Sequence, residues 1–179
     1  WNPAGTHTGN AFDARATAGA LALDFSNNSV VLSAATGVLL DGTGATLTVT
    51  GFANNDVSGN TAGTGVSATN VRFDAIPGGA FQQVAAGATT IGESGNGVGA
   101  AGILLANVSG DLAFADLDIY ANNGAGLQAS SAAAYTGSAG LQLAVDADAA
   151  SVSAVGGPAV DLNTVTAAWK TSICCGTYN

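Results

Sequence analysis

Short phrases built from Gly, Asn and an aliphatic residue return in altered form along this chain. Val57-Ser58-Gly59-Asn60 is echoed by Val108-Ser109-Gly110-Asp111, at an offset in numbering of 108 − 57 = 51. A related phrase runs from Ile119 to Leu127. Each phrase consists of a short β-prone stretch, a polar corner of Asn and Gly, and then Gly with an aliphatic residue. Degenerate repetition of this kind is the sequence signature of a solenoid built from stacked coils.

Pairs of Gly with an aliphatic residue, and pairs of Asn, also recur. The spacing between successive Gly-aliphatic pairs is uneven, and the first two Asn pairs are offset by 54 − 27 = 27. Such spacing is typical of a solenoid whose corners vary in length. We predict that a corner Asn bonds the Asn one coil above, and that Gly supplies the positive φ of a corner. The pairs are Gly37-Val38, Gly65-Val66, Gly102-Ile103, Gly126-Leu127 and Gly140-Leu141, and Asn27-Asn28, Asn54-Asn55 and Asn122-Asn123.

The composition agrees with β-structure rather than helix. Hydrophobic residues make up 47% of the 179 residues and aromatic residues only 6%, so the core must be built mainly from Ala, Val, Leu and Ile. Charged residues are 8%, against roughly 25% in an ordinary soluble domain. A surface solvated by Ser, Thr, Asn and Gly indicates short strands joined by many turns.

The charge balance excludes one class of partner. The net charge is −9, and Arg15, Arg72 and Lys170 are the only basic residues. Binding a nucleic-acid backbone needs several cations on one face, and anionic lipid has a similar requirement. The longest apolar run, residues 99–106, is too short to span a bilayer. The sequence therefore predicts no nucleic-acid partner and no membrane insertion.

Short segments of alternating polarity predict the strands. They are Ala20 to Phe25, Thr46 to Thr50, Val71 to Asp74, Leu112 to Tyr120, Leu141 to Val145 and Ser151 to Val155. We expect an all-β chain that folds as a right-handed parallel β-helix of roughly seven short coils, each of about 24–30 residues. An antiparallel β-sandwich or jelly roll is the alternative.

The uniform composition predicts one domain over residues 1–179. Residues 1–15 are expected to form an N-terminal extension or cap, and residues 166–179 a C-terminal cap that contains Cys174 and Cys175. The adjacent cysteines leave three alternatives open: free thiols, a covalent link to another chain or segment, or a strained vicinal disulfide. Zinc is not expected, because His7 is the only histidine and lies at the other end of the chain.

Two segments resemble a known class of repeat. Residues 56–66 and 118–127 look like the right-handed parallel β-helix repeats that fill secreted bacterial surface proteins, namely adhesins, autotransporter-like passengers and β-strand-repeat proteins. The resemblance implies an exported protein at the cell surface or outside the cell. The scarcity of Lys and the richness in Thr, Asn and Gly also favour export. The absence of Met and a first residue of Trp1 suggest a processed or excised segment.

One stretch carries the most suggestive candidate site. If residues 114–120 form one strand, Ala115, Leu117 and Ile119 point inward. The other side chains of the stretch then project together from the outer face. Aromatic rings beside carboxylates can stack on sugar rings and bond their hydroxyls. The candidate glycan-binding residues are Phe114, Asp116, Asp118 and Tyr120.

A second pair of carboxylates repeats the same spacing. Asp146 follows Asp116, and Asp148 follows Asp118, at the same offset of 146 − 116 = 30, which is close to one coil. Four clustered carboxylates could bind Ca²⁺ through oxygen ligands. They could also serve as acid and base in glycoside hydrolysis, or simply solvate the surface. Because no basic residue lies beside the four, an enzyme is the less favoured interpretation, and no catalytic residue is assigned.

These observations lead to two functional expectations. The first is a structural or adhesive β-helical segment of an exported surface protein, which assembles with copies of itself or with other segments into a larger structure or fibre. The second is a glycan-binding or glycan-processing β-helix that uses the outward Asp and aromatic face. No cofactor is required in either case, and Ca²⁺ is the one that the clustered carboxylates could bind.

Overall fold

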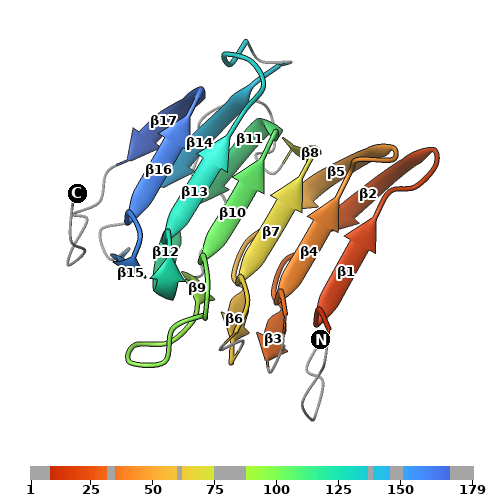
Figure 1. Ribbon diagram of the computed structural model, residues 1–179. Helices are drawn as coiled ribbons and strands as arrows, with labels where there is room; N and C mark the ends of the chain where they lie inside the picture. Colours follow the sequence, from red (N-terminus) through yellow and green to blue (C-terminus); the bar gives the residue numbers. More distant parts are fainter. Residues whose placement is uncertain are drawn as a thin grey trace.

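The computed structural model describes residues 9–31, 35–59, 62–74, 88–136, 139–145 and 151–169. Over these residues the regular structure consists of strands that form three sheets, and all pairings between the strands are parallel (Figure 1). No helix in this part of the chain is long and apolar enough to cross a membrane. The antiparallel alternative is therefore wrong, since every sheet ladder runs in one direction.

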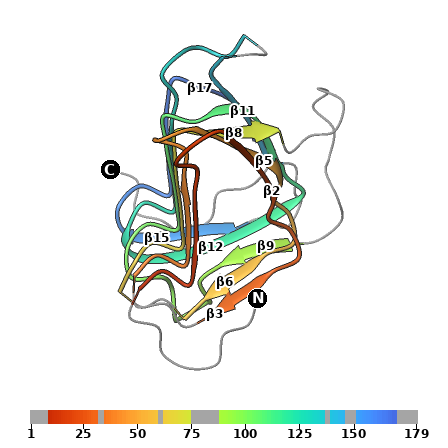
Figure 2. The ribbon, with the colours of Figure 1, turned by 90° about the vertical axis from the view of Figure 1, so that its right-hand side faces the viewer.

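Each coil contributes one strand to each sheet, so neighbouring strands differ by three in chain order. The first sheet contains β1 (Phe12–Arg15), β4 (Val38–Asp41), β7 (Val66–Thr69), β10 (Ile103–Ala106), β13 (Leu127–Ser130) and β16 (Val160–Asn163). The second contains β2 (Ala20–Asp24), β5 (Thr46–Gly51), β8 (Val71–Asp74), β11 (Ser109–Phe114), β14 (Leu141–Val145) and β17 (Val165–Trp169). The third contains β3 (Ser29–Val31), β6 (Asp56–Ser58), β9 (Ala88–Ile91), β12 (Asp116–Gly124) and β15 (Ser151–Gly156). Figure 2 shows the three sheets enclosing one core.

This order of strands is that of a parallel β-helix, as predicted. The described residues form about six coils rather than seven, because two coils exceed the expected length. Along the first sheet, Val66 pairs with Ile103, an offset of 103 − 66 = 37, and Leu127 pairs with Val160, an offset of 160 − 127 = 33. The other three steps of that sheet are shorter and join Phe12 to Val38, Val38 to Val66 and Ile103 to Leu127.

Four of the Gly-aliphatic pairs occupy one column of the helix. Their aliphatic residues are in register in the first sheet, each starts a strand, and each is at most 1% exposed. The Gly before each strand lies in the corner between the third and first sheets. There a Cβ on Gly65 would lie 2.3 Å from Ile91 Cγ2 and 2.6 Å from the carbonyl oxygen of Gly102, so only Gly fits. The fifth pair, Gly140-Leu141, belongs to the second sheet.

The Val-Ser-Gly echo is not a structural repeat. Val57 lies in β6 of the third sheet, whereas Val108 precedes β11 of the second sheet. The register of the third sheet instead aligns Val57 with Ile91 and Ile91 with Ile119. The similarity of the two phrases is local, because β-strands and Gly corners occur on every side of the coil.

Asn residues form the predicted contacts between coils at two corners. Between the second and third sheets, the Asn54 side chain donates to Asn27 Oδ1 at 2.9 Å, and both residues have positive φ, at 53° and 58°. Between the first and second sheets, Asn107 donates in the same way to Asn70. Asn122 and Asn123 differ, because they donate to the backbone carbonyls of Gly97 and Gly99.

The interior contains aliphatic columns and one aromatic column. Inward residues such as Val38, Val57 and Leu127 are fully buried. The rings of Phe12, Phe25 and Phe52 follow one another with centroids 4.8 and 5.7 Å apart. Phe114 continues this column with its centroid 6.1 Å from that of Phe52, at a right angle to it.

The two ranges expected as caps contain strands. Residues 12–15 form β1, which pairs with β4, and residues 165–169 form β17, which pairs with β14. Cys174 and Cys175 lie outside the described residues.

Candidate functional site

The predicted Asp and aromatic face lies on β12 of the third sheet. Leu117 and Ile119 are fully buried, whereas Asp116, Asp118 and Tyr120 alternate with them and are half-buried. The alternation expected over this part of the stretch is therefore present, and these three side chains share the outer face of β12.

Phe114 does not belong to this face, and its assignment as an outward residue is wrong. β11 ends at Phe114 and β12 begins at Asp116, so residues 112–120 are two strands of two different sheets rather than one. The corner at Ala115 breaks the period-two alternation. Phe114 consequently faces the core, where it is 3% exposed and packs against Phe52.

The carboxylate of Asp118 has a structural partner. Its Oδ1 accepts hydrogen bonds from the backbone N–H of Ser151 at 3.1 Å and from the Ser151 hydroxyl at 2.8 Å. Ser151 is the residue in register with Asp118 on the next coil. Asp116 Oδ1 is buried and has no hydrogen-bond partner among the described residues.

Only two of the four carboxylates that were expected to form a cluster lie within the described residues. Asp146 and Asp148 lie outside the described residues. The register between β12 and β15 pairs Asp118 with Ser151, an offset of 151 − 118 = 33, so the Asp spacing does not match one coil here. Within the described ranges, no group of three His, Cys, Asp or Glu side chains lies close enough to hold a metal ion.

The two ends of the β-helix form a different candidate site. At one end the outermost strands of the three sheets are β1, β2 and β3, and at the other they are β16, β17 and β15 (Figure 1). Among the described residues each of these strands pairs on one side only, which leaves a row of backbone donors and acceptors on the other.

The hydrogen bonds between coils reveal which backbone groups face outward along the helix axis. Phe12 N and Ala16 N donate to carbonyls of the neighbouring coil, so the intervening Asp13 and Arg15 turn their N–H and C=O groups away from it. At the opposite end, the carbonyls of Ala159 and Asn163 accept from β13 and the residue that follows it. The same alternation directs the backbone groups of Val160 and Leu162 outward.

Inward-facing side chains are also less covered at both ends. Val160 is half-buried and Leu162 likewise, although the residues in register with them, Leu127 and Ala129, are at most 1% exposed. At the other end Phe12 is half-buried and Leu21 is 39% exposed. Both ends therefore combine uncovered apolar side chains with edge strands.

Arg15 and Asp13 form an ion pair on the outer face of β1. Arg15 Nε lies 2.8 Å from Asp13 Oδ1, and Nη2 donates to Oδ2 at 3.0 Å. The hydrogen bond from Arg15 holds the pKa of Asp13 below its usual value, despite the opposing effect of partial burial. The pair keeps the exposed face of the edge strand polar.

Sequence reasoning included the residues of β1 in an N-terminal extension or cap and did not identify them as a strand. The available signal was the alternation of Phe12 and Ala14 with the charged Asp13 and Arg15, which is a short half-buried strand.

Comparisons of the chain with protein-family models, with curated proteins and with solved structures found no match. The proposed function therefore rests on the geometry of the β-helix.

Proposed function

We propose that this chain is a structural segment of an exported surface protein and that it assembles end to end with copies of itself. The observation that supports this proposal is the pair of open ends, each of which has an edge strand of the first sheet and uncovered inward side chains. Pairing β16 of one copy with β1 of the next would extend the sheet by the same parallel ladder that joins the coils within one chain.

The register within the chain specifies the contacts at such a junction. Phe12 aligns with Val38, and that column continues through Val66, Ile103 and Leu127 to Val160. Continuing it places Val160 against Phe12 of the next copy, and Leu162 against Ala14. Burial of these side chains supplies a hydrophobic contribution in addition to the new backbone hydrogen bonds.

The polar faces are compatible with this alignment. Asp161 comes into register with Asp13 of the next copy, which would oppose two carboxylates. Each already has a partner of its own: Asp13 pairs with Arg15, and Asp161 accepts from Gln128 Nε2 at 2.9 Å. Arg15 lies two positions beyond Asp13 on the same face and so adds a cation near Asp161.

An extracellular or cell-surface location belongs to the same proposal. It is supported by the low charge content of 8%, the net charge of −9 and the resemblance of residues 56–66 and 118–127 to repeats of secreted surface proteins.

Two substitutions at one position test the assembly. Arg15→Pro removes an N–H that faces the open end and makes no bond within the coil, whereas Arg15→Ala removes the same side chain and keeps the N–H. We expect light scattering and electron microscopy to show concentration-dependent assembly of the wild type and, at a higher protein concentration because Asp13 loses its partner, of Arg15→Ala. Arg15→Pro should remain monomeric while its circular dichroism is unchanged.

Two results would contradict the proposal. One is a wild-type chain that stays monomeric at every concentration, with and without reductant and Ca²⁺. The other is assembly of Arg15→Pro to the same extent as Arg15→Ala, because the open backbone edge would then play no part.

A further inference from the structure

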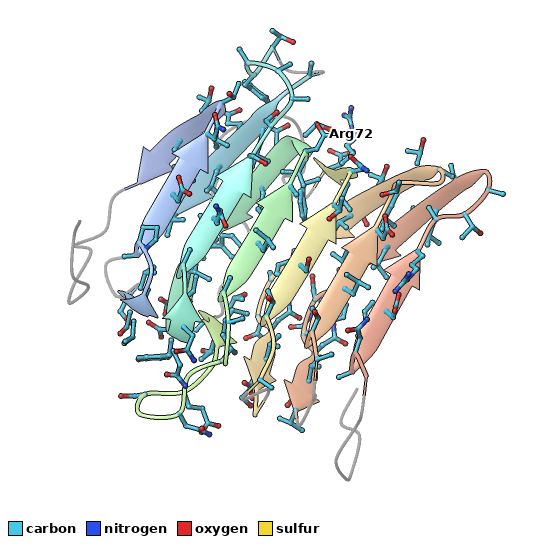
Figure 3. All side chains as sticks on the ribbon, in the orientation of Figure 1. Arg72 is labelled. Atoms are coloured by element: carbon cyan, nitrogen blue, oxygen red, sulfur yellow. The ribbon has the colours of Figure 1, made fainter. Side chains whose placement is uncertain are left out.

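A polar hollow lies at the corner between the first and second sheets, away from both ends. Its volume is about 410 Å³, and it extends across successive coils from the turn that precedes β5 to the start of β11. Arg72 projects from the rim of the β-helix at this corner (Figure 3). The lining side chains with polar groups are those of Thr43, Thr46, Asn70, Arg72, Asn107 and Ser109.

Arg72 is an exposed cation that forms no ion pair with a described residue. Arg15, the other arginine, is already paired with Asp13. The residues in register with Arg72 on the neighbouring strands are Thr48 and Ser109, which are both neutral. Asp74 is exposed on the same face two residues further along β8, but no hydrogen bond joins it to Arg72. No described residue therefore uses the N–H donors of the Arg72 guanidinium, and these donors are available to a ligand.

A directed chain of hydrogen bonds uses one amide N–H of Asn107 and one of Asn70 on one side of the hollow. Asn107 Nδ2 donates to Asn70 Oδ1, and Asn70 Nδ2 donates to Thr43 Oγ1 at 2.8 Å. Hydrogen bonds from the Thr43 hydroxyl and its backbone N–H then lower the pKa of Asp41. The carboxylate of Asp41 is thus already supplied with hydrogen-bond donors by Thr43.

The groups that remain define the ligand chemistry. Arg72 offers a planar fork of N–H donors, which matches a carboxylate better than a point charge does. The hydroxyls of Thr46 and Ser109 can each donate or accept. Asn107 is the first donor of the directed chain, and its Oδ1 accepts no hydrogen bond from a described residue. A ligand that carries hydroxyls as well as a carboxylate matches all of these donors and acceptors.

We infer that the hollow around Arg72 binds an acidic sugar, with its carboxylate on Arg72 and its hydroxyls on Thr46, Ser109 and Asn107. This binding site is separate from the ends used for assembly, and it is also separate from the Asp116, Asp118 and Tyr120 face of the third sheet. It would allow an assembled β-helix to hold an acidic polysaccharide along its side.

The test uses NMR titration of the whole chain with a uronic-acid tetrasaccharide. The arginine Nε signal of Arg72 and the side-chain amide signals of Asn70 and Asn107 should shift and saturate. Arg72→Gln should weaken binding by about tenfold or more, as expected for loss of a charged hydrogen bond. Arg72→Lys should restore it only in part, and Arg15→Gln, the matched control, should leave it unchanged.

Two ligand controls decide the outcome. A neutral glucose tetrasaccharide should cause no saturable shift, because it has no carboxylate for Arg72. Acetate should bind much more weakly than the uronic-acid oligomer, because it lacks hydroxyls. The inference is overturned if no signal responds to the oligomer, if Arg72→Gln binds it as well as the wild type, or if acetate matches it.

Discussion

Gly102 lies directly against Ile119 at the corner between the third and first sheets. A Cβ on Gly102 would stand 2.2 Å from Ile119 Cγ2 and 2.5 Å from the carbonyl oxygen of Gly126. Both neighbours are held in place, because Ile119 is fully buried and the Gly126 carbonyl accepts from Ile103 N at 2.9 Å. A contact of this kind explains why Gly is required by packing at the corners that precede β4, β7, β10 and β13.

Gly102→Ala should therefore destabilise the β-helix. We expect a loss of about 1–3 kcal/mol in the free energy of unfolding, the usual cost of overpacking a tight core. Urea unfolding followed by circular dichroism measures it. Gly9→Ala is the matched control, because nothing lies within 4 Å of the added Cβ. Equal stability of the two variants would show that the corner relaxes freely.

Asn55 should contribute more to stability than its neighbour Asn54. Asn55 is 1% exposed, its Nδ2 donates to Phe25 O at 2.9 Å, and its Oδ1 accepts from Asn28 N at 3.1 Å. Asn55→Ala leaves both backbone partners without a hydrogen bond and should lower the free energy of unfolding by about 2–4 kcal/mol. Asn54→Gly keeps the positive φ and loses only the exposed bond to Asn27, so it should cost about 1 kcal/mol. Thermal unfolding of both variants checks the ranking, which a reversed order would refute.

Thr164 offers a route to a more stable chain. It is a β-branched residue with φ of 59°, a conformation that Asn and Gly adopt at much lower cost. Thr164→Asn should raise the free energy of unfolding by about 1 kcal/mol. Thr166→Asn is the control in the neighbouring strand β17, where Asn is disfavoured and stability should fall slightly. A destabilised Thr164→Asn variant would show that the Thr side chain compensates for its backbone.

Tyr135 should make stability depend on alkaline pH. Its hydroxyl donates to Asp111 Oδ1 at 2.7 Å, and this bond, together with burial and the charge of Asp111, raises the pKa of Tyr135 despite the opposing charge of Arg72. The raised folded-state pKa means that the stabilisation is complete below the unfolded pKa of about 10 and is lost as pH rises through the folded value.

The melting temperatures of wild type and Tyr135→Phe therefore begin to converge above pH of about 10 and meet once the pH has passed the raised folded-state pKa of Tyr135. Asp111→Asn should lower the pKa of Tyr135, which can be read from its absorbance on titration. A melting difference that stays constant from neutral to alkaline pH would argue against the hydrogen bond as its source.

Several strands could be predicted from local patterns because their alternation of inward and outward residues is clear. The predicted ranges Val71–Asp74 and Leu141–Val145 coincide with β8 and β14. Four of the six strands of the first sheet, β4, β7, β10 and β13, were marked only by the Gly-aliphatic pairs at their starts. In β4 and β10 the outward positions carry the apolar residues Leu39 and Leu104, so these strands show no clear alternation of polar and apolar residues.

The candidate site was less predictable because it depends on where a coil turns its corner. Asp116, Asp118 and Tyr120 share a face as expected, but the bend at Ala115 moves Phe114 into the core. Nothing in the local pattern distinguishes a strand that continues from one that changes sheet. Arg72 was recognised only as one of three cations, and its position beside Asn70 and Asn107 depends on stacking of coils.

By itself the sequence determined the class of fold, because recurring Gly and Asn corners, short strands and an aliphatic core are compatible with few architectures other than a β-helix. The tertiary structure decided the register. It aligned Val57 with Ile91 and Ile119, not with Val108, and it made about six coils because two coils are longer than the rest. The physical reason is that a corner can absorb extra residues without changing the strand pairing. Equivalent positions are therefore set by backbone hydrogen bonds between coils and not by a fixed spacing along the chain.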